Sequence, residues 1–307
     1  MKISRRQSIA EISSIAVVSS LQSAVRAATG TEPLIATNMY PWSTFAKRAK
    51  EPFQAHSDQL LEDIASCGIA GYEPIINSAA EFDSLGERLE KHSLKMRSIY
   101  VNSTLHDESL VDKSIESVVE IGDSAAKLGV KIIVTNPSPI RWGGPEDKTD
   151  SQLRLQAKSL DRLGAELKKR SIVLAYHNHD AELRQGAREF HHMLTGTDAT
   201  NVKFCLDSHW VFRGCGDSEV AVFDALEQYK ERIVELHLRQ SKQGVWTEAF
   251  TMQGDIDYVR LFGFLESQSI TPHLVLEQAV ENGSANDLGC VKAHRKGNQD
   301  LLTFMSR

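Results

Sequence analysis

The 307-residue chain predicts one α/β domain in which eight parallel strands close into a (β/α)8 barrel. From residue 32 onward, apolar runs of strand length alternate with longer amphipathic segments, and eight such runs are present. The last four end in residues able to bind a divalent metal, namely His177, Asp207, His237 and Glu277. The gaps between them are 30, 30 and 40 residues, about the length of one strand–helix unit. A closed ring of parallel strands would bring these four ends to one mouth.

The expected elements follow one another in strict alternation. Strands are expected at residues 34–39, 71–75, 96–101, 131–135, 172–176, 202–206, 233–238 and 274–276. Helices are expected at residues 58–66, 80–92, 110–128, 151–169, 187–195, 220–228 and 256–268, where apolar residues recur at three- and four-residue spacing. Gly68 and Gly129 fall where helices should end, as glycine prefers. Eight alternating units favour closure of the sheet.

Polar and aromatic residues follow the first four strands as well. They are Asn38, Tyr40, Trp42, Glu73, Tyr100, Asn102 and Asn136. Residues at the C-terminal ends of barrel strands form the pocket of such a fold. Rings that stack and amides that bind hydroxyl groups suit a carbohydrate.

Composition and motifs exclude several function classes. A net charge of −6 and a pI near 6.0 argue against a nucleic-acid partner, which requires a basic surface. No internal run approaches the roughly 18 apolar residues of a membrane span. No glycine-rich GxGxxG motif follows the first strand, and no phosphate-binding glycine loop is evident. The substrate is therefore expected to carry no phosphate.

Residues 1–28 are expected to be a signal peptide rather than part of the barrel at 32–307. Arg5 and Arg6 precede an apolar, Ala/Ser-rich stretch, and this arrangement resembles a twin-arginine signal. Ser8 and Glu11 depart from the usual pattern, because an aromatic residue and an apolar residue are typical there. The resemblance implies export of the folded protein to the periplasm. If the segment is only an amphipathic leader, the protein stays cytoplasmic.

The motifs of the second half also resemble a known family. They are Tyr176-His177-Asn178-His179-Asp180 with Glu182, then Leu206-Asp207-Ser208-His209-Trp210, His237-Leu238 and Leu276-Glu277. In order and spacing they resemble the sugar phosphate isomerase/epimerase superfamily, whose members have a xylose isomerase-like barrel. The resemblance covers roughly residues 33–307 and implies a divalent metal at the barrel mouth, held by residues of the later strands.

Carried over by position, Asp207, His237 and Glu277 match ligands of that family directly. His177 stands where many members have glutamate, as in a subset with a YHNH motif. His179 faces the same side of the strand as His177, so either histidine is a candidate ligand. Two imidazoles and two carboxylates favour a transition metal over calcium. The expected cofactor is Mn²⁺, with Co²⁺, Fe²⁺, Zn²⁺ or Mg²⁺ as alternatives.

The resemblance also assigns roles around the metal. Glu277 is expected to act as ligand and base, with His179 or His209 as the second acid–base group. Arg239 is expected to stabilise an enediolate, although Gln240 replaces the family's frequent acid beside that cation. For two further residues, two roles are possible. Trp210 either stacks on a sugar ring or fills a loop, and Glu182 either contacts a sugar hydroxyl or caps a helix. Asn38, Trp42 and Tyr100 complete the expected substrate pocket.

Three functions are open at this point. The first is a metal-dependent isomerase or epimerase that acts through an enediolate on a non-phosphorylated keto-sugar. The second is a lyase or hydratase that cleaves or hydrates a keto-sugar or a 3-keto-glycoside by β-elimination. The third is a barrel that binds a sugar without turnover. Relatives in the family often associate over the barrel mouth, so a homo-oligomer is also expected.

Overall fold

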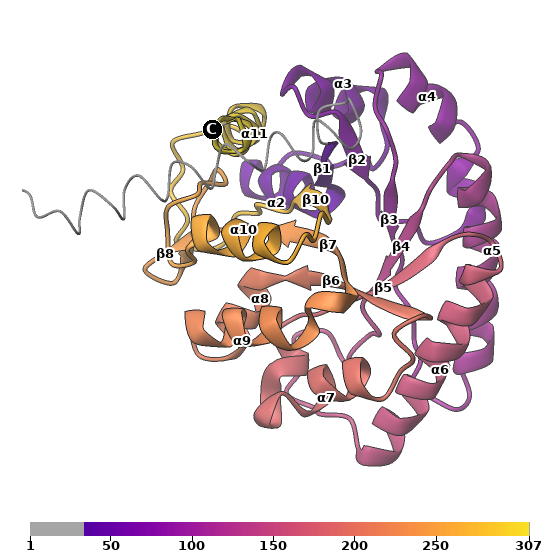
Figure 1. Ribbon diagram of the computed structural model, residues 1–307. Coiled ribbons are helices and arrows are strands. Elements are labelled where there is room, and N and C mark those ends of the chain that lie inside the picture. The colour runs from indigo at the N-terminus through magenta and orange to yellow at the C-terminus, as the bar shows by residue number, and fades with distance from the viewer. Residues whose placement is uncertain (1–33, 307) are drawn as a thin grey trace, which may run out of the picture.

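Eight parallel strands form the centre of the molecule (Figure 1). The computed structural model describes residues 34–306, so the expected signal peptide at 1–28 lies outside the described residues. The strands are β1 (Ile35–Asn38), β2 (Gly71–Glu73), β3 (Ser98–Tyr100), β4 (Ile132–Thr135), β5 (Val173–His177), β6 (Val202–Asp207), β7 (Ile233–Leu238) and β10 (His273–Leu276). Their order in the sheet is β2-β1-β10-β7-β6-β5-β4-β3.

The ring closes between β2 and β3. Parallel bridges join Gly71 to Lys95 and Ile75 to Tyr100. In addition, the amide of Tyr72 donates to the carbonyl of Lys95 at 2.9 Å. The expected (β/α)8 barrel is therefore confirmed, and the C-terminal ends of all eight strands lie at one mouth.

Helices surround the strands (Figure 1). They are α2 (Met39–Ala49), α3 (Asp58–Ser66), α4 (Leu85–Lys91), α5 (Val111–Lys127), α6 (Asp150–Lys168), α7 (Arg184–Thr195), α8 (Ser208–Gly214), α9 (Glu219–Tyr229), α10 (Tyr258–Ser267) and α11 (Cys290–Met305). Each long helix buries an apolar stripe against the sheet, as Ile115, Val118 and Ile121 do in α5. Ser57 caps α3, and Thr149 forms a capping box with Gln152 at the start of α6.

The structure differs from the expected elements in five places. The helix expected at 80–92 is split into a 3-10 turn, η1 (Ala79–Phe82), and α4, because Ser84 has a φ of 122° that no helix permits. Helices α2, α8 and α11 were not expected. A short hairpin of β8 (Ser241–Lys242) and β9 (Val245–Trp246) follows β7 and was also not expected.

Two of the unexpected helices begin directly at strand ends. The side chain of Asn38 accepts the amide hydrogen of Tyr40 and caps α2, while the side chain of Asp207 accepts that of Trp210 and caps α8. No turn residues separate strand from helix at either point. The strand-end side chains are therefore fixed by the helices that follow them.

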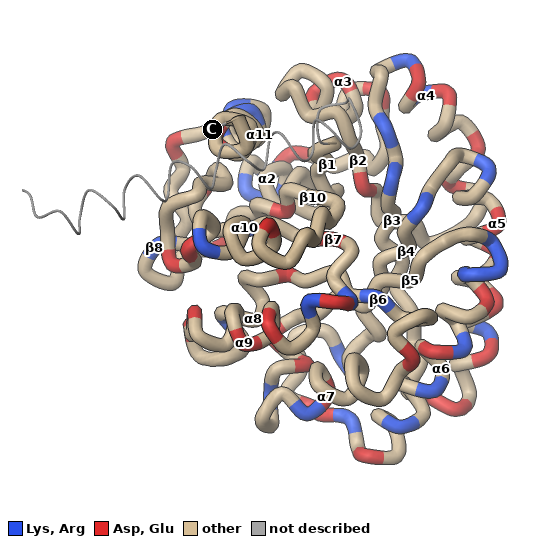
Figure 2. Tube along the Cα trace, in the orientation of Figure 1, with Lys and Arg blue, Asp and Glu red and all other residues tan. Residues whose placement is uncertain are grey.

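The outer surface carries both signs of charge. In the orientation of Figure 2, lysines and arginines alternate with aspartates and glutamates along the outer helices. Single ion pairs of this kind link neighbouring helices, such as Arg170 of the α6–β5 connection with Asp123 of α5 at 2.7 Å. Among the described residues, no helix is both long enough and apolar enough to cross a bilayer.

Candidate metal centre and its pocket

Four side chains from neighbouring strands meet at the barrel mouth. His177 ends β5, Asp207 ends β6, His237 lies in β7, and Glu277 directly follows β10. The register of the sheet brings Asp207 opposite His237, because these two residues pair between β6 and β7. One ligand atom from each of the four lies within 4.8 Å of those of the other three, and all four residues are buried. The expected convergence on one point is thus present.

The polar atoms that face this point lack other partners. His177 Nε2, Asp207 Oδ2 and His237 Nδ1 are buried and have no hydrogen-bond partner among the described residues. Buried polar atoms are normally paired, so a group of orphaned donors and acceptors aimed at one centre points to a ligand. His177 Nε2 lies 3.8 Å from Asp207 Oδ2, and His237 Nδ1 lies 3.4 Å from Glu277 Oε2. The residues present therefore fit a divalent cation held by two imidazole nitrogens and two carboxylates.

Burial acts differently on the four groups. It would lower the pKa of His237, but Cys205, Glu73 and Glu277 outweigh it and raise that pKa well above its ordinary value. Burial lowers the pKa of His177 well below its ordinary value, so the imidazole is neutral, as a metal ligand must be. Burial raises the pKa of Asp207 to about 7. Burial would also raise the pKa of Glu277, but the charges of His237 and Arg239 outweigh it and lower that pKa to about 2. Glu277 is therefore a carboxylate throughout the physiological range.

A second layer of carboxylates holds His237 from below. His237 Nε2 lies 3.0 Å from Glu73 Oε1 and 3.3 Å from Glu235 Oε1. Glu73 is fixed in turn, because Asn38 Nδ2 donates to it at 2.7 Å and Ser98 Oγ at 2.6 Å. A proton on Nε2 that is donated to Glu73 leaves the lone pair of Nδ1 facing the cluster.

The two buried carboxyls differ in protonation. Burial and the nearby carboxylate of Glu73 raise the pKa of Glu235 well above its usual range. Burial opposes ionisation of Glu73 too, but His237 lowers its pKa to about 2. Glu73 is thus the charged partner of His237, and Glu235 is the neutral one.

Arg239 is the cation beside the cluster. It is fully buried, its Nε donates to the Glu277 carbonyl at 3.0 Å, and its Nη2 donates to Glu277 Oε2 at 2.6 Å. Nη1 has no hydrogen-bond partner among the described residues. The guanidinium lies over Trp246 at 4.3 Å and over Trp210 at 4.9 Å. Glu277 therefore orients Arg239, a task that the family's acid at the position of Gln240 would otherwise perform.

His179 stands between the cluster and the pocket opening. Its ring lies 4.8 Å from that of His177, 5.6 Å from Trp210 and 5.3 Å from Trp142. Burial lowers the pKa of His179 to about 4, so its imidazole is neutral at pH 7 and can accept a proton. His177, rather than His179, belongs to the four-residue cluster.

Glu182 has a role that neither reading of the sequence contained. Its side chain is buried, and its Oε2 accepts the backbone N–H of His179 at 2.6 Å. It lies in the 3-10 turn η2 (Ala181–Leu183), before α7. Burial, followed by repulsion from Glu189, raises the pKa of Glu182 to about 7. It holds the turn that carries His179 and does not line the pocket.

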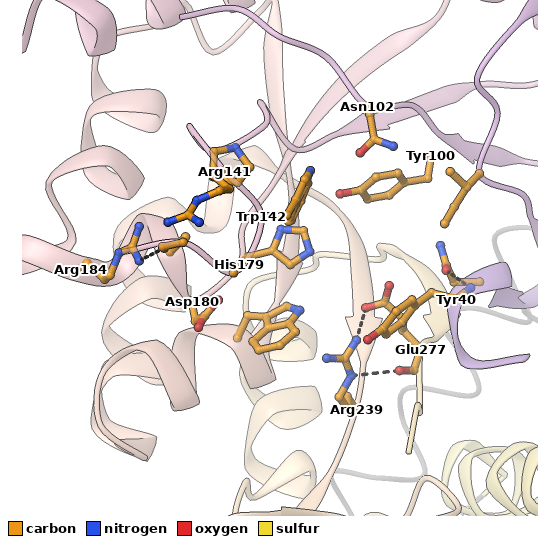
Figure 3. Close-up of a pocket in the computed structure, with 17 residues that line it drawn as sticks. Tyr40, Tyr100, Asn102, Arg141, Trp142, His179, Asp180, Arg184, Arg239 and Glu277 are labelled. Atoms are coloured by element: carbon orange, nitrogen blue, oxygen red, sulfur yellow. Dashed lines mark hydrogen bonds and ion pairs between the residues drawn. The ribbon is translucent and has the colours of Figure 1, made fainter. Parts of the chain in front are cut away.

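A cavity of about 480 Å³ opens above the cluster (Figure 3). The residues that line it include Asn38, Tyr40, Tyr100, Asn102, Trp142, His179, Asp180, Trp210, Arg239 and Glu277. Of the residues expected to bind substrate, Asn38, Tyr100, Trp210 and Arg239 are in this lining. Arg141, Trp142 and Arg184 also line the pocket and were not expected there. For Trp142 the sequence does contain a signal, because this residue precedes a Gly-Gly-Pro turn after the fourth strand, where a pocket loop is expected.

The structure places two expected site residues elsewhere. Trp42 is buried under α11, where it stacks on His294 with ring centroids 4.0 Å apart and donates its indole N–H to Thr37 Oγ1 at 3.2 Å. It turns away from the pocket because α2 begins immediately after β1. His209 is buried in α8 against Phe212 and Trp246, outside the pocket lining and outside the cluster.

Comparison with known proteins gives consistent likenesses. A family model described as xylose isomerase-like TIM barrel matches residues 61–296. The chain is 24% identical over 259 residues to inosose dehydratase of Clostridium perfringens (strain 13 / Type A), a match that covers 75% of this chain and 85% of that protein. It is 23% identical over 227 residues to inosose dehydratase of Lacticaseibacillus casei, covering 64% and 74%.

Solved structures of sugar epimerases share the fold. The 3-keto-D-glucoside 4-epimerase of E. coli aligns with a TM-score of 0.65 at 15% identity, covering 89% of this chain and 100% of that one. The D-psicose 3-epimerase of Clostridium cellulolyticum H10 aligns with a TM-score of 0.67 at 14% identity, covering 88% and 99%. At these identities the likeness concerns the fold alone.

Proposed function

Because the chain belongs to the xylose isomerase-like TIM barrel family, we propose that it is a divalent-metal-dependent enzyme that removes a proton beside the carbonyl of a non-phosphorylated keto-sugar. The observation that carries the proposal is the buried cluster of His177, Asp207, His237 and Glu277, of which Glu277 lines the pocket. Three buried polar atoms without a hydrogen-bond partner, His177 Nε2, Asp207 Oδ2 and His237 Nδ1, belong to this cluster, and the adjoining cavity is lined by aromatic and amide side chains.

The four cluster residues would hold the metal, and Mn²⁺ is the proposed ion. When bound, a divalent ion supplies Lewis acidity, which makes the hydrogen beside a carbonyl more acidic. Glu73 would keep the Nε2 proton of His237 in place, so that Nδ1 remains a ligand atom.

We assign the proton transfer to two side chains of the pocket lining. Glu277, directly after β10, is ionised, and His179, two residues beyond the end of β5, is neutral (Figure 3). In the proposed step one of them takes the proton from carbon, and the C–H electron pair forms the C=C bond of an enediolate as the carbonyl electrons move to oxygen. The unpaired Nη1 of Arg239 can donate a hydrogen bond to that oxygen.

The fate of the enediolate defines the reaction. Return of a proton to the opposite face of the same carbon is epimerisation, and return to the neighbouring carbon is isomerisation. We take these as the leading reaction, since two acid–base groups, Glu277 and His179, line one pocket.

Elimination is the second candidate. In that reaction the enediolate expels a β-substituent, which leaves as water or an alcohol after it receives a proton. The curated relatives are inosose dehydratases, and His177 replaces the glutamate that many members of the family carry. The relatives favour elimination, and the replacement leaves Glu277 as the one glutamate of the four-residue cluster.

Deuterium exchange tests the proposal. The Mn²⁺-loaded protein is incubated in D₂O with a panel of ketoses and 3-keto-glucosides, and NMR follows the hydrogen beside the carbonyl. We expect exchange that is lost in His237→Ala and in Glu277→Gln. An epimer with an intact skeleton identifies an epimerase, and release of water or an alcohol identifies a lyase. If the native protein binds a sugar saturably but catalyses no exchange, the proposed enzymatic function is refuted. The remaining hypothesis is then a barrel that binds a sugar without turnover.

We also propose that residues 1–28 direct export through the twin-arginine route. The support is the Arg5-Arg6 pair ahead of the apolar stretch. Fractionation of cells that express the full chain should find the protein in the periplasm, and replacement of both arginines by lysine should retain it in the cytoplasm. Periplasmic protein at undiminished level in the lysine variant would contradict this route.

A further inference from the structure

Trp142 is an exposed indole at the mouth of the pocket. It lies between β4 and α6, lines the cavity, and is 55% exposed. Its ring meets His179 edge to face, with centroids 5.3 Å apart and planes at 88° (Figure 3). A large aromatic side chain that is held at a pocket rim yet remains half in water is typical of a surface that binds a ligand.

The loop that carries Trp142 is braced from α7. Arg184 donates from Nη1 to the carbonyl of Gly144 at 2.9 Å and from Nη2 to that of Glu146 at 3.1 Å. The same guanidinium pairs through Nε with Asp147 at 3.0 Å. Arg141 pairs with Glu146 at 2.6 Å. Trp142 is therefore presented by a fixed loop, which lowers the entropy lost when a ligand binds.

These ion pairs also bear on which ligand charge the outer pocket accepts. Both arginines that line the outer pocket are already neutralised by Glu146 and Asp147, so they offer no free cation to a phosphate or carboxylate. Asp180 lines the same region and would repel an anion. Its carboxylate suits hydroxyl groups instead.

The order of the rings separates an inner from an outer space. Trp210 and Arg239 flank the cluster, with the guanidinium 4.9 Å from the indole. His179 follows, 5.6 Å from Trp210, and Trp142 lies on the other side of His179. A sugar ring placed over the cluster would contact Trp210 and His179, which leaves Trp142 for a second group.

We infer that Trp142, Asp180 and Gly143 form an outer subsite that binds a second, uncharged ring. The natural substrate is then a glycoside, whose oxidised sugar lies over the cluster and whose aglycone or second sugar stacks on Trp142. This inference rests on the proposed function, because it takes the inner space as the sugar site.

Matched substrates test the subsite. Turnover of methyl 3-keto-β-glucoside is compared with that of the phenyl 3-keto-β-glucoside and of 3-keto-cellobiose, which separate an aromatic aglycone from a second sugar. The native protein should prefer one of the larger compounds in kcat/KM. Trp142→Ala should reduce that preference by about three- to tenfold, the contribution of one aromatic contact. Trp142→Phe should retain most of it, and Val220→Ala, an exposed residue of α9, should retain all of it.

A binding measurement separates this inference from the proposed reaction. Calorimetry with the unoxidised methyl and phenyl β-glucosides and cellobiose requires no turnover, so it reports on the subsite even if no keto-sugar is consumed. Weaker binding of a larger compound to Trp142→Ala, with methyl glucoside binding changed no more than twofold, supports the subsite. Equal losses for all compounds, or no preference for a larger compound in the native protein by either method, would overturn it.

Discussion

Nε2 of His237 lies 3.0 Å from Oε1 of Glu73, a contact that joins β7 to β2 across the barrel. Because His237 also approaches Glu277 through Nδ1 at 3.4 Å, its two ring nitrogens serve different purposes. One is held by the protein and the other is presented to the cluster. The geometry of the candidate metal site therefore depends on a carboxylate that is not itself among the four cluster residues.

Glu73→Gln should weaken metal binding. Loss of the charged partner removes the group that fixes the orientation and tautomer of His237, and changes of this kind typically reduce metal affinity by about 10- to 100-fold. Titration of the metal-free protein with Mn²⁺ in a calorimeter gives the affinity. Glu235→Gln is the matched control, because glutamine resembles the protonated carboxyl that Glu235 carries. Equal affinity losses in the two variants would contradict a special role for Glu73.

Arg239→Lys should lower kcat more than it raises KM. A lysine cannot hold Glu277 through two nitrogens and still point a third toward the substrate oxygen. Loss of one donor to a developing oxyanion costs about 100-fold in kcat. Steady-state kinetics on the keto-sugar found by deuterium exchange gives both constants. Arg213→Lys, at an arginine that pairs with Glu281, is the control and should change kcat little. A variant whose KM rises at constant kcat would show that Arg239 only binds substrate.

The contribution of Glu182 to the stability of the protein should fall as the pH rises from about 5 to 8. Burial raises the pKa of Glu182 from 4.5 to about 7 in the folded state, so within this window the folded state holds a proton that the unfolded state has lost. The free energy of unfolding then decreases with pH, by up to about 3 kcal/mol from this group. Buried histidines with a lowered pKa, such as His179, contribute with the opposite sign in the lower part of this window, so the comparison must be made against a variant of Glu182.

Glu182→Gln isolates the contribution of Glu182. Urea denaturation of the native protein and the variant at pH 5 and pH 8, under the same metal concentration, gives the difference. Between pH 5 and pH 8 the native protein should lose stability relative to the variant, by up to about 3 kcal/mol, because glutamine does not titrate. An identical change in the two proteins would show that Glu182 is ionised throughout.

Trp42 and Trp210 were both expected to line the substrate pocket, but their replacement by alanine should have different effects. Trp42→Ala should reduce the free energy of unfolding by about 3 kcal/mol or more, since it empties a buried site, and should leave KM nearly unchanged. Trp210→Ala should raise KM, because Trp210 lines the pocket. Denaturation and steady-state kinetics of both variants measure these effects. A raised KM in a Trp42→Ala protein of unchanged stability would show that Trp42 contacts the substrate.

The barrel and the convergence of its metal-binding residues could be predicted because strands leave a strong local pattern. Each of the last four apolar runs ended in a ligand-type residue, and parallel strands place such ends together without any knowledge of the register. Helices α2 and α8 were missed for the opposite reason. They begin on the strand-end residues Asn38 and Asp207 themselves, so the sequence has no turn to mark them.

The second layer of the site could not be predicted. Glu73 reaches His237 only through the closure of the ring, which sets how far β2 lies from β7, and no pattern in either strand encodes that distance. The sequence reading also assigned Trp42 and His209 to the pocket from proximity to strand ends. Both side chains instead pack under helices, because the chain turns into a helix within one or two residues.

Metal content tests the central claim most directly. Mass spectrometry on the purified native protein, with Mn²⁺ added if necessary, should find about one equivalent of a divalent transition metal per chain. The equivalent should be lost in His237→Ala and Glu277→Gln and retained in His209→Ala, whose ring lies outside the cluster. Two results would contradict a metal centre formed by His177, Asp207, His237 and Glu277. One is a native protein that binds no metal, and the other is an equal loss of metal in His209→Ala.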